Sequence, residues 1–341
     1  MRAFEIVLSL ANALALACLA VRRHRSGCPA GFVGAAAALC ACLQVFLEGQ
    51  RWQMVPAYAL TAALLLAGIV QVEELVSRGY VVVGLDQPGG SAAVRLTDGR
   101  TVTVLPREQI QTLIQQSITP AAVVPVLNGR PLPDGIIPCF AQDVSFSIDQ
   151  LTALNHRDPN VRPAEPLTGR LDLDRLGVFG ISLGAMVAGE ACLRDARVKA
   201  ALMMDAAMPA DVVRAGLRQP CIWISRPASD MRLERSRSGG WPESSITETL
   251  ATMRAVFDAH QRGRAYYLDM PGMFHVNFTD APFWSLLTAH LGLTGPVDGV
   301  RMWGIVNAYS VAFFDEYLKG RQESLLDEPA GQPQGVRLYR R

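Results

Sequence analysis

The stretch from Leu173 to Asp205 constrains the fold more than any other part of the chain. It reads as strand, turn, helix and second strand, and the turn places Ser182 between Gly180 and Gly184. A serine in a G-x-S-x-G pattern between a strand and a helix lies on a sharp turn, which needs neighbours without a bulky Cβ and leaves the hydroxyl exposed above the sheet. The alternative is an ordinary turn serine. The flanking strand and helix favour a nucleophile.

Strands that alternate with helices are predicted for most of the chain after residue 70. Apolar runs that read as strands lie at residues 80–85, 198–204, 220–225 and 264–270, and helical patterns lie at residues 73–78, 143–155, 247–260 and 302–319. This alternation predicts a doubly wound, mostly parallel α/β sheet with its site at the carboxyl ends of the strands. We expect this domain to span residues 71–320, with a flexible tail over residues 321–341.

Three segments interrupt the alternation. Residues 91–105 read as two short β pieces around a turn at Asp98-Gly99, and residues 119–138 read as a surface excursion. Residues 226–237 are rich in arginine, and we expect a solvated loop there rather than a phosphate site. No other basic block is present and the net charge is +1, which argues against nucleic acid as a partner.

Three apolar runs occupy the first 70 residues, at about 4–21, 30–47 and 54–70. Each is near the length that crosses the hydrocarbon core of a bilayer as a helix. The first run alone also fits a cleaved signal peptide, because Arg2 precedes it, but two further runs favour an anchor. The sequence therefore predicts an all-α, multi-pass membrane segment of three transmembrane helices over residues 1–70.

The short loops of this segment predict its orientation. Arg22, Arg23 and Arg25 lie between the first two runs, whereas the second loop holds Glu48 and Arg51. The positive-inside rule places the arginine-rich loop in the cytoplasm. Because three crossings follow from the three runs, we expect the catalytic domain to be cytoplasmic as well.

Three polar residues, Ser182, Asp205 and His275, each follow the end of a predicted strand. Their order along the chain is that of α/β-hydrolases. Such chemistry needs a histidine that takes the serine proton and a carboxylate that orients the histidine, and it needs no metal or organic cofactor. Asp230 is a second candidate for the acid, since it follows the run at residues 220–225. Spacing alone leaves both acids open.

Three motifs resemble the platelet-activating-factor acetylhydrolase group of α/β-hydrolases: GISLGA at residues 180–185, ALMMDAAM at 201–208 and MFHVNF at 273–278. The resemblance extends over roughly residues 71–290, and the segment EGQRWQMVPAY is similar to membrane-anchored bacterial members. It implies Ser182, Asp205 and His275 as the triad of a calcium-independent serine esterase. It also implies short or oxidised acyl esters as substrates, including phospholipids, and hence a role in lipid degradation.

One segment of that group has no counterpart here. Its members carry a central strand that ends in a loop before the helix beginning at Val72, and that loop donates one oxyanion-hole amide. The Leu183 amide remains as one donor. We therefore expect an incomplete sheet, with a strand absent between residues 80–85 and 176–179, and weak activity. The alternative is a hydrolase-like membrane protein that serves as a binding or scaffold module.

Overall fold

A five-stranded sheet forms the centre of the computed structural model, which describes residues 69–156, 167–239, 242–260, 264–280, 282, 292–327, 333 and 335–341. Its strands lie side by side in chain order: β5 (Leu176–Ile181), β6 (Val198–Met204), β7 (Cys221–Ser225), β8 (Ala265–Asp269) and β9 (Arg337–Arg340). The first four are parallel, and β9 pairs antiparallel with β8. Four of the predicted strands and the parallel sheet are thus confirmed.

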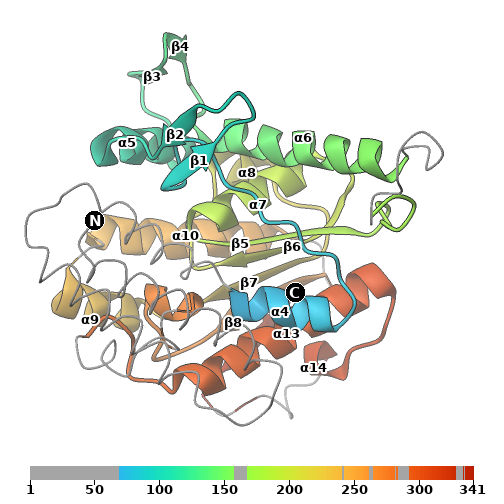
Figure 1. The fold of residues 1–341 in the computed structure, drawn as a ribbon. Coiled ribbons are helices and arrows are strands. Elements are labelled where there is room, and N and C mark those ends of the chain that lie inside the picture. The colour runs from blue at the N-terminus through green and yellow to red at the C-terminus, as the bar shows by residue number, and fades with distance from the viewer. Residues whose placement is uncertain are drawn as a thin grey trace, which may run out of the picture.

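The central strands are continuous apolar runs because they are covered on both faces. All five residues of β7 are buried, and six of the seven residues of β6 are buried. One face packs against α6 (Ile137–Asn155), α7 (Leu183–Arg194), α8 (Ala210–Ala215) and α10 (Glu243–Ala259). The other face packs against α4 (Ile69–Ser77), α13 (Gly299–Lys319) and α14 (Ser324–Asp327). Figure 1 shows the resulting three layers.

Two small hairpins and a helix extend the layer that contains α6 (Figure 1). The hairpin of β1 (Ala93–Arg95) and β2 (Thr101–Thr103) turns at Asp98-Gly99, as predicted. Between it and the hairpin of β3 (Val126–Leu127) and β4 (Arg130–Pro131) lies α5 (Arg107–Ile118), a helix that the sequence pattern did not predict. Its sequence is mostly polar, yet Ile110, Leu113, Ile114 and Ile118 have the i, i+3, i+4 and i+8 spacing of an amphipathic helix, a signal that sequence reasoning missed.

The predicted strand at residues 80–85 does not form. The segment is extended but pairs with no other strand of the described residues, and β5 is an edge strand there. Tyr80 and Phe179 both contact the ring of Phe314, with centroids 6.3 Å apart in each pair. Tyr80 and Phe179 of β5 thus contact one side chain of α13, and no strand of the described residues pairs with the free side of β5. The predicted absence of a strand here stays a prediction.

Two other predictions are wrong. The arginine-rich segment is not a solvated loop: most of it forms α9 (Ala228–Ser238), and Arg226 is fully buried. The chain end predicted to be a flexible tail supplies α14 and β9, and β9 completes the sheet beside β8. Both segments are short and charged. The first is ordered by ion pairs and the second by strand pairing, and sequence composition reveals neither kind of partner.

The three predicted transmembrane helices fall in residues 1–68, outside the described residues, except that Ile69 and Val70 begin α4. Within the described ranges, no helix combines the length and apolar character needed to cross a bilayer.

Candidate active site

Ser182 occupies a strained turn between β5 and α7. Its φ of 55° and ψ of −123° are unusual for a residue with a side chain. A Cβ on Gly180 would lie 2.3 Å from the Gly184 carbonyl carbon, so only glycine allows the strand and helix to approach this closely. The Ser182 N–H donates a hydrogen bond to the Met204 carbonyl at 2.9 Å. This is the predicted turn at a strand-to-helix junction.

Asp205 follows β6, directly beside the serine turn. Ile181 pairs with Met204 in the parallel register, so Ser182 and Asp205 both leave the sheet at its carboxyl edge. Asp205 also has a positive φ, of 48°, and its side chain is fully buried. Its Oδ1 accepts from the Ser225 hydroxyl at 3.2 Å, and its Oδ2 accepts from Arg226 Nε at 2.9 Å.

His275 begins the 3-10 helix η1 (His275–Phe278) after β8, and its ring meets Asp205. The distance from Nδ1 to Asp205 Oδ2 is 2.7 Å, and the side chain of His275 is 21 % exposed. Asn277 fixes the backbone around the ring, because its Oδ1 accepts the N–H groups of Phe274 at 2.8 Å and Gly295 at 2.7 Å. The histidine is therefore held at the end of β8.

The electrostatics favour an ionised Asp205. Burial alone raises the pKa of this carboxyl, but the Arg226 guanidinium and the hydrogen bond from His275 outweigh burial, and the pKa lies below its usual value. An ionised carboxylate accepts from the Nδ1–H of a neutral imidazole, and this tautomer leaves the lone pair on Nε2. The arrangement can thus provide a base that is oriented by a buried acid.

Asp230, the other candidate acid, lies in the first turn of α9 and serves a different group. Its Oδ2 accepts the backbone N–H of Gly272 at 2.6 Å. Of the two candidates, Asp205 is the one that forms the side-chain hydrogen bond to His275.

Leu183, the predicted oxyanion donor, is the first residue of α7, and the loop after residues 80–85 packs against it. A Cβ on Gly90 would lie 3.2 Å from the Leu183 side chain and 3.2 Å from the Phe140 ring. Gly89 in the same loop has a φ of 84°. The Gln87-Pro88-Gly89-Gly90 loop therefore borders the serine turn, a position that the sequence pattern did not indicate.

Sequence reasoning also missed Arg226, Glu234 and Asn277. Arg226 and Glu234 lie in the segment that we expected to be solvated, and composition gives no signal that they are buried. For Asn277 a signal was available, since the H-x-N-F motif contains it.

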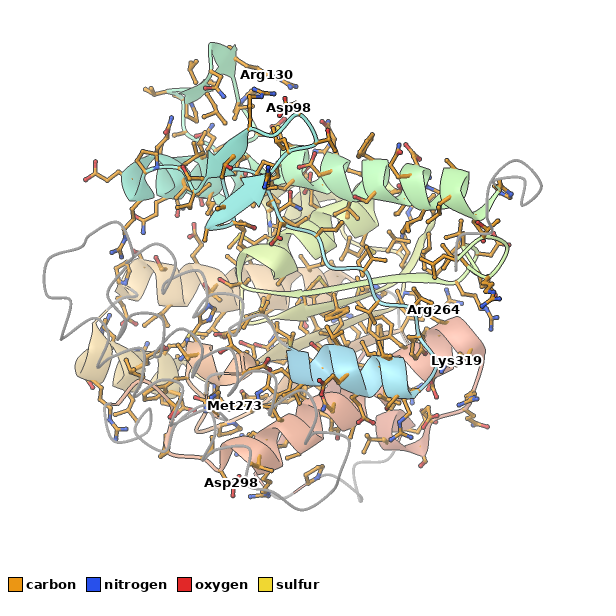
Figure 2. The ribbon with its side chains drawn as sticks, in the orientation of Figure 1. Asp98, Arg130, Arg264, Met273, Asp298 and Lys319 are labelled. Carbon is orange, nitrogen blue, oxygen red and sulfur yellow. The ribbon has the colours of Figure 1, made fainter. Side chains whose placement is uncertain are left out.

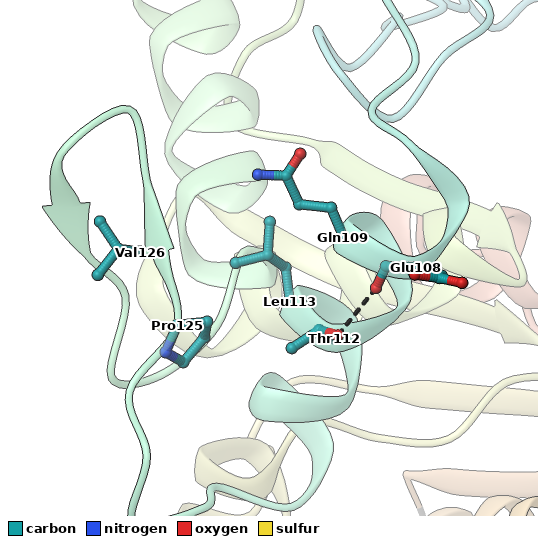
Figure 3. Close-up of a pocket in the computed structure, with 6 residues that line it drawn as sticks. All are labelled: Glu108, Gln109, Thr112, Leu113, Pro125 and Val126. Carbon is teal, nitrogen blue, oxygen red and sulfur yellow. Dashed lines mark hydrogen bonds between the residues drawn. The ribbon is translucent and has the colours of Figure 1, made fainter.

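A hollow of about 350 Å³ lies elsewhere, between α5 and the segment that leads into β3 (Figure 3). Its lining includes Glu108, Thr112 and Leu113 but none of the predicted site residues. Figure 2 shows that Asp98 and Arg130, in the hairpins beside α5, lie far from Met273, which is two residues before His275. Among the described residues, no group of His, Cys, Asp and Glu side chains is placed to hold a metal ion.

No protein-family model matches the chain, and no curated protein matches it. Among solved structures, the ferulic acid esterase from Streptomyces cinnamoneus is similar in fold, with a TM-score of 0.56 and 24 % sequence identity. The match covers 81 % of this chain and 71 % of that one. Together with the parallel sheet and its layers of helices, this similarity shows that the chain has an α/β-hydrolase-type fold.

Proposed function

We propose that this protein is a serine carboxylic-ester hydrolase. Ser182 is the nucleophile, His275 the general base and Asp205 the residue that orients the histidine. The observation that carries the proposal is the 2.7 Å hydrogen bond between Asp205 and His275, at the sheet edge where Ser182 lies on its strained turn. A buried acid, a histidine and a serine in these places are the parts that acyl transfer needs.

In the proposed reaction the Ser182 hydroxyl attacks the ester carbonyl carbon while His275 Nε2 takes the hydroxyl proton. The Leu183 N–H donates to the oxyanion of the tetrahedral intermediate. The intermediate collapses when the C–O bond to the alcohol breaks and His275 returns the proton to the leaving oxygen. Water then attacks the acyl-enzyme by the same route and releases the acid.

For the substrate we propose short or oxidised acyl esters, including those of phospholipids, and for the location a multi-pass membrane anchor with a cytoplasmic hydrolase domain. The three resembling motifs and the apolar runs before residue 70 support these choices. A C-terminal reporter on the full chain is expected to be active only on the cytoplasmic side. Activity on the opposite side would contradict the proposed topology.

A catalytically impaired binding or scaffold module is the second candidate, and one observation favours it. The β5 edge is unpaired among the described strands, where an oxyanion-loop strand lies in complete relatives. Turnover of p-nitrophenyl acetate by the membrane-embedded chain separates the two candidates. The esterase predicts turnover that Ser182→Ala abolishes and that Ser236→Ala, a change of an exposed serine on α9, leaves intact. The scaffold predicts equal background rates for all three proteins.

A further inference from the structure

Arg226 is a fully buried cation that joins two carboxylates behind the candidate triad. It directly follows β7, and its Nε lies 2.9 Å from Asp205 Oδ2 while its Nη1 lies 2.5 Å from Glu234 Oε2. A charge without exposure to water is costly unless it is paired with good geometry. A buried arginine that contacts a candidate catalytic acid is therefore expected to have a specific role.

Glu234 extends the pairing to the histidine. It lies on α9 with its side chain 8 % exposed, and its Oε2 accepts the backbone N–H of His275 at 3.4 Å. The histidine ring in turn contacts Asp205. These contacts form a closed circuit of four residues: Asp205, Arg226, Glu234 and His275. The acid and the histidine are therefore held by the same arginine–glutamate pair.

The charges of this circuit explain why both partners are present. Arg226 keeps Asp205 ionised and oriented, but its positive charge also offsets the negative charge that stabilises an imidazolium. Glu234 restores that negative charge. The two carboxylates and the guanidinium together carry one net negative charge, which is the charge that a lone triad acid would present to the ring.

We propose that Arg226 and Glu234 are positioning residues of the candidate site: Arg226 orients Asp205, and Glu234 supplies the negative charge that stabilises the protonated form of His275. The catalytic consequence rests on the proposed esterase function. The effect on the histidine ring does not, because it depends only on the charges around the ring.

Other titratable or charged groups surround the circuit, and the test leaves them unchanged. Asp230 accepts a hydrogen bond from the Gly272 N–H, and the Arg237 guanidinium lies 5.7 Å from the centroid of the Phe274 ring. Tyr267 and Asp269 of β8 and Arg254 of α10 interact electrostatically with Asp205, with Asp230 or with one another. Asp280 follows η1, and Asp298 caps the start of α13.

The test is the titration of His275 in the full chain, followed by NMR of ¹⁵N-labelled histidine and assigned with His275→Gln. We expect Glu234→Gln to lower the titration midpoint of His275 by about one pH unit and Arg226→Met to raise it by about one unit. The double variant restores one net negative charge and is expected to return the midpoint to within a few tenths of a unit of the wild-type value. The acidic limb of kcat/KM for p-nitrophenyl acetate is expected to move in the same way.

Glu243→Gln is the matched control. Its carboxylate pairs with Arg232 and Arg235 of α9 at 2.6 and 3.0 Å, but the pair is solvent-exposed. Water and salt screen such a pair, so the His275 midpoint is expected to stay unchanged.

Unmoved midpoints in Glu234→Gln and in Arg226→Met would overturn the proposal and leave the pair a purely structural role. If Arg226→Met does not fold, Glu234→Gln decides the outcome: a lowered midpoint supports the proposal, and an unmoved midpoint overturns it. If the midpoints move as expected while no variant and no wild-type chain turns over an ester, the esterase function fails and the charge balance stands.

Discussion

At the residue scale, two of the three side chains proposed for catalysis lie where the backbone departs from ordinary geometry. Ser182 and Asp205 are two of the three residues other than glycine with a positive φ among the described residues. Such conformations cost roughly 1–3 kcal/mol each and persist where the surrounding structure fixes them. Here the parallel pairing of β5 and β6 does so, because both strained residues follow paired positions.

Replacing the acid distinguishes Asp205 from Asp230. Asp205→Asn is expected to lower kcat by about 10⁴, because an amide no longer holds the imidazole in its basic tautomer. Asp230→Asn is expected to cost little, since the lost interaction is a hydrogen bond from the Gly272 amide. Steady-state kinetics on p-nitrophenyl acetate measure both. Equal losses of kcat in the two variants, or a larger loss in Asp230→Asn, would assign the role of the acid to Asp230.

The raised pKa of Glu190 leads us to predict how the stability of the fold depends on pH. Burial first, and then nearby Asp211, raise the pKa of this carboxyl to about 7, although Arg194 pairs with it. Between about pH 5 and pH 7 the Glu190 carboxyl therefore keeps its proton in the folded state, whereas in the unfolded state, where its pKa is lower, it has lost the proton. Because the folded state binds more protons in this range, the free energy of unfolding falls as the pH rises from about 5 to 7. We expect a loss of about 2–3 kcal/mol between pH 5 and pH 8.

Urea unfolding at several pH values measures this dependence, and Glu190→Gln is the informative variant. A neutral side chain removes the linked proton, so we expect the profile between pH 5 and pH 8 to flatten. A variant profile as steep as that of the wild type would assign the dependence to another group.

At the element scale, the sequence predicts strands better than it predicts their neighbours. The runs at residues 80–85 and 198–204 have the same apolar character, yet β6 is buried between two strands and residues 80–85 pair with no strand that the structure describes. Strand propensity describes a side chain that suits a pleated surface, whereas pairing depends on which other segment is present. The H-x-N-F motif is local, and its histidine follows β8, as expected for a residue after a predicted strand.

Charged segments were the hardest to predict. An arginine in a charged segment is normally expected at the surface. Arg226 is buried because it pairs with Asp205 and Glu234, and the sequence pattern does not indicate either pairing. β9 has the sequence RLYR, which is too short and too charged to predict a strand. Arg226 and β9 are both held by partners from other parts of the chain. Composition contains no information about such partners.

Tyr339 tests whether β9 contributes to stability. The guanidinium of Arg254 lies 5.1 Å from the centroid of its ring, and the ring of Tyr267 lies 6.3 Å away. Tyr339→Ala is expected to lower the free energy of unfolding by about 1 kcal/mol through loss of the aromatic and cation–π contacts. Arg337→Ala, in the same strand, is the control. Equal stability of the Tyr339→Ala variant and the wild type would mean that these ring contacts add nothing to the stability of the fold.

At the scale of the whole molecule, the expected activity is limited by the edge of β5, which pairs with no strand among the described residues. Loss of one oxyanion donor typically costs about 10² to 10³ in rate. Val70 and Gln71 lie inside α4, and Gln71 is buried with its amide bonded to Ser310 Oγ at 2.7 Å. A strand and loop from a complete relative must therefore be inserted before Ile69.

Such a graft is expected to raise ester turnover at least tenfold, because it supplies a second donor and a strand to pair with the edge of β5 that no described strand covers. A graft that spans the same length but lacks the loop amide serves as the control and is expected to leave the rate low. If both grafted chains fold and neither gains activity, the second donor is already present elsewhere, and the Gln87-Pro88-Gly89-Gly90 loop beside Leu183 is the first place to search.

The most direct test of the central claim is covalent labelling of Ser182. A fluorophosphonate reacts with a serine only where a neighbouring base activates the hydroxyl. After labelling of the full chain and peptide mapping by mass spectrometry, we predict one adduct, on the peptide that contains Ser182, and none in Ser182→Ala or His275→Gln. A folded wild-type chain that carries no adduct, or carries it on another serine, would contradict the assignment of this site.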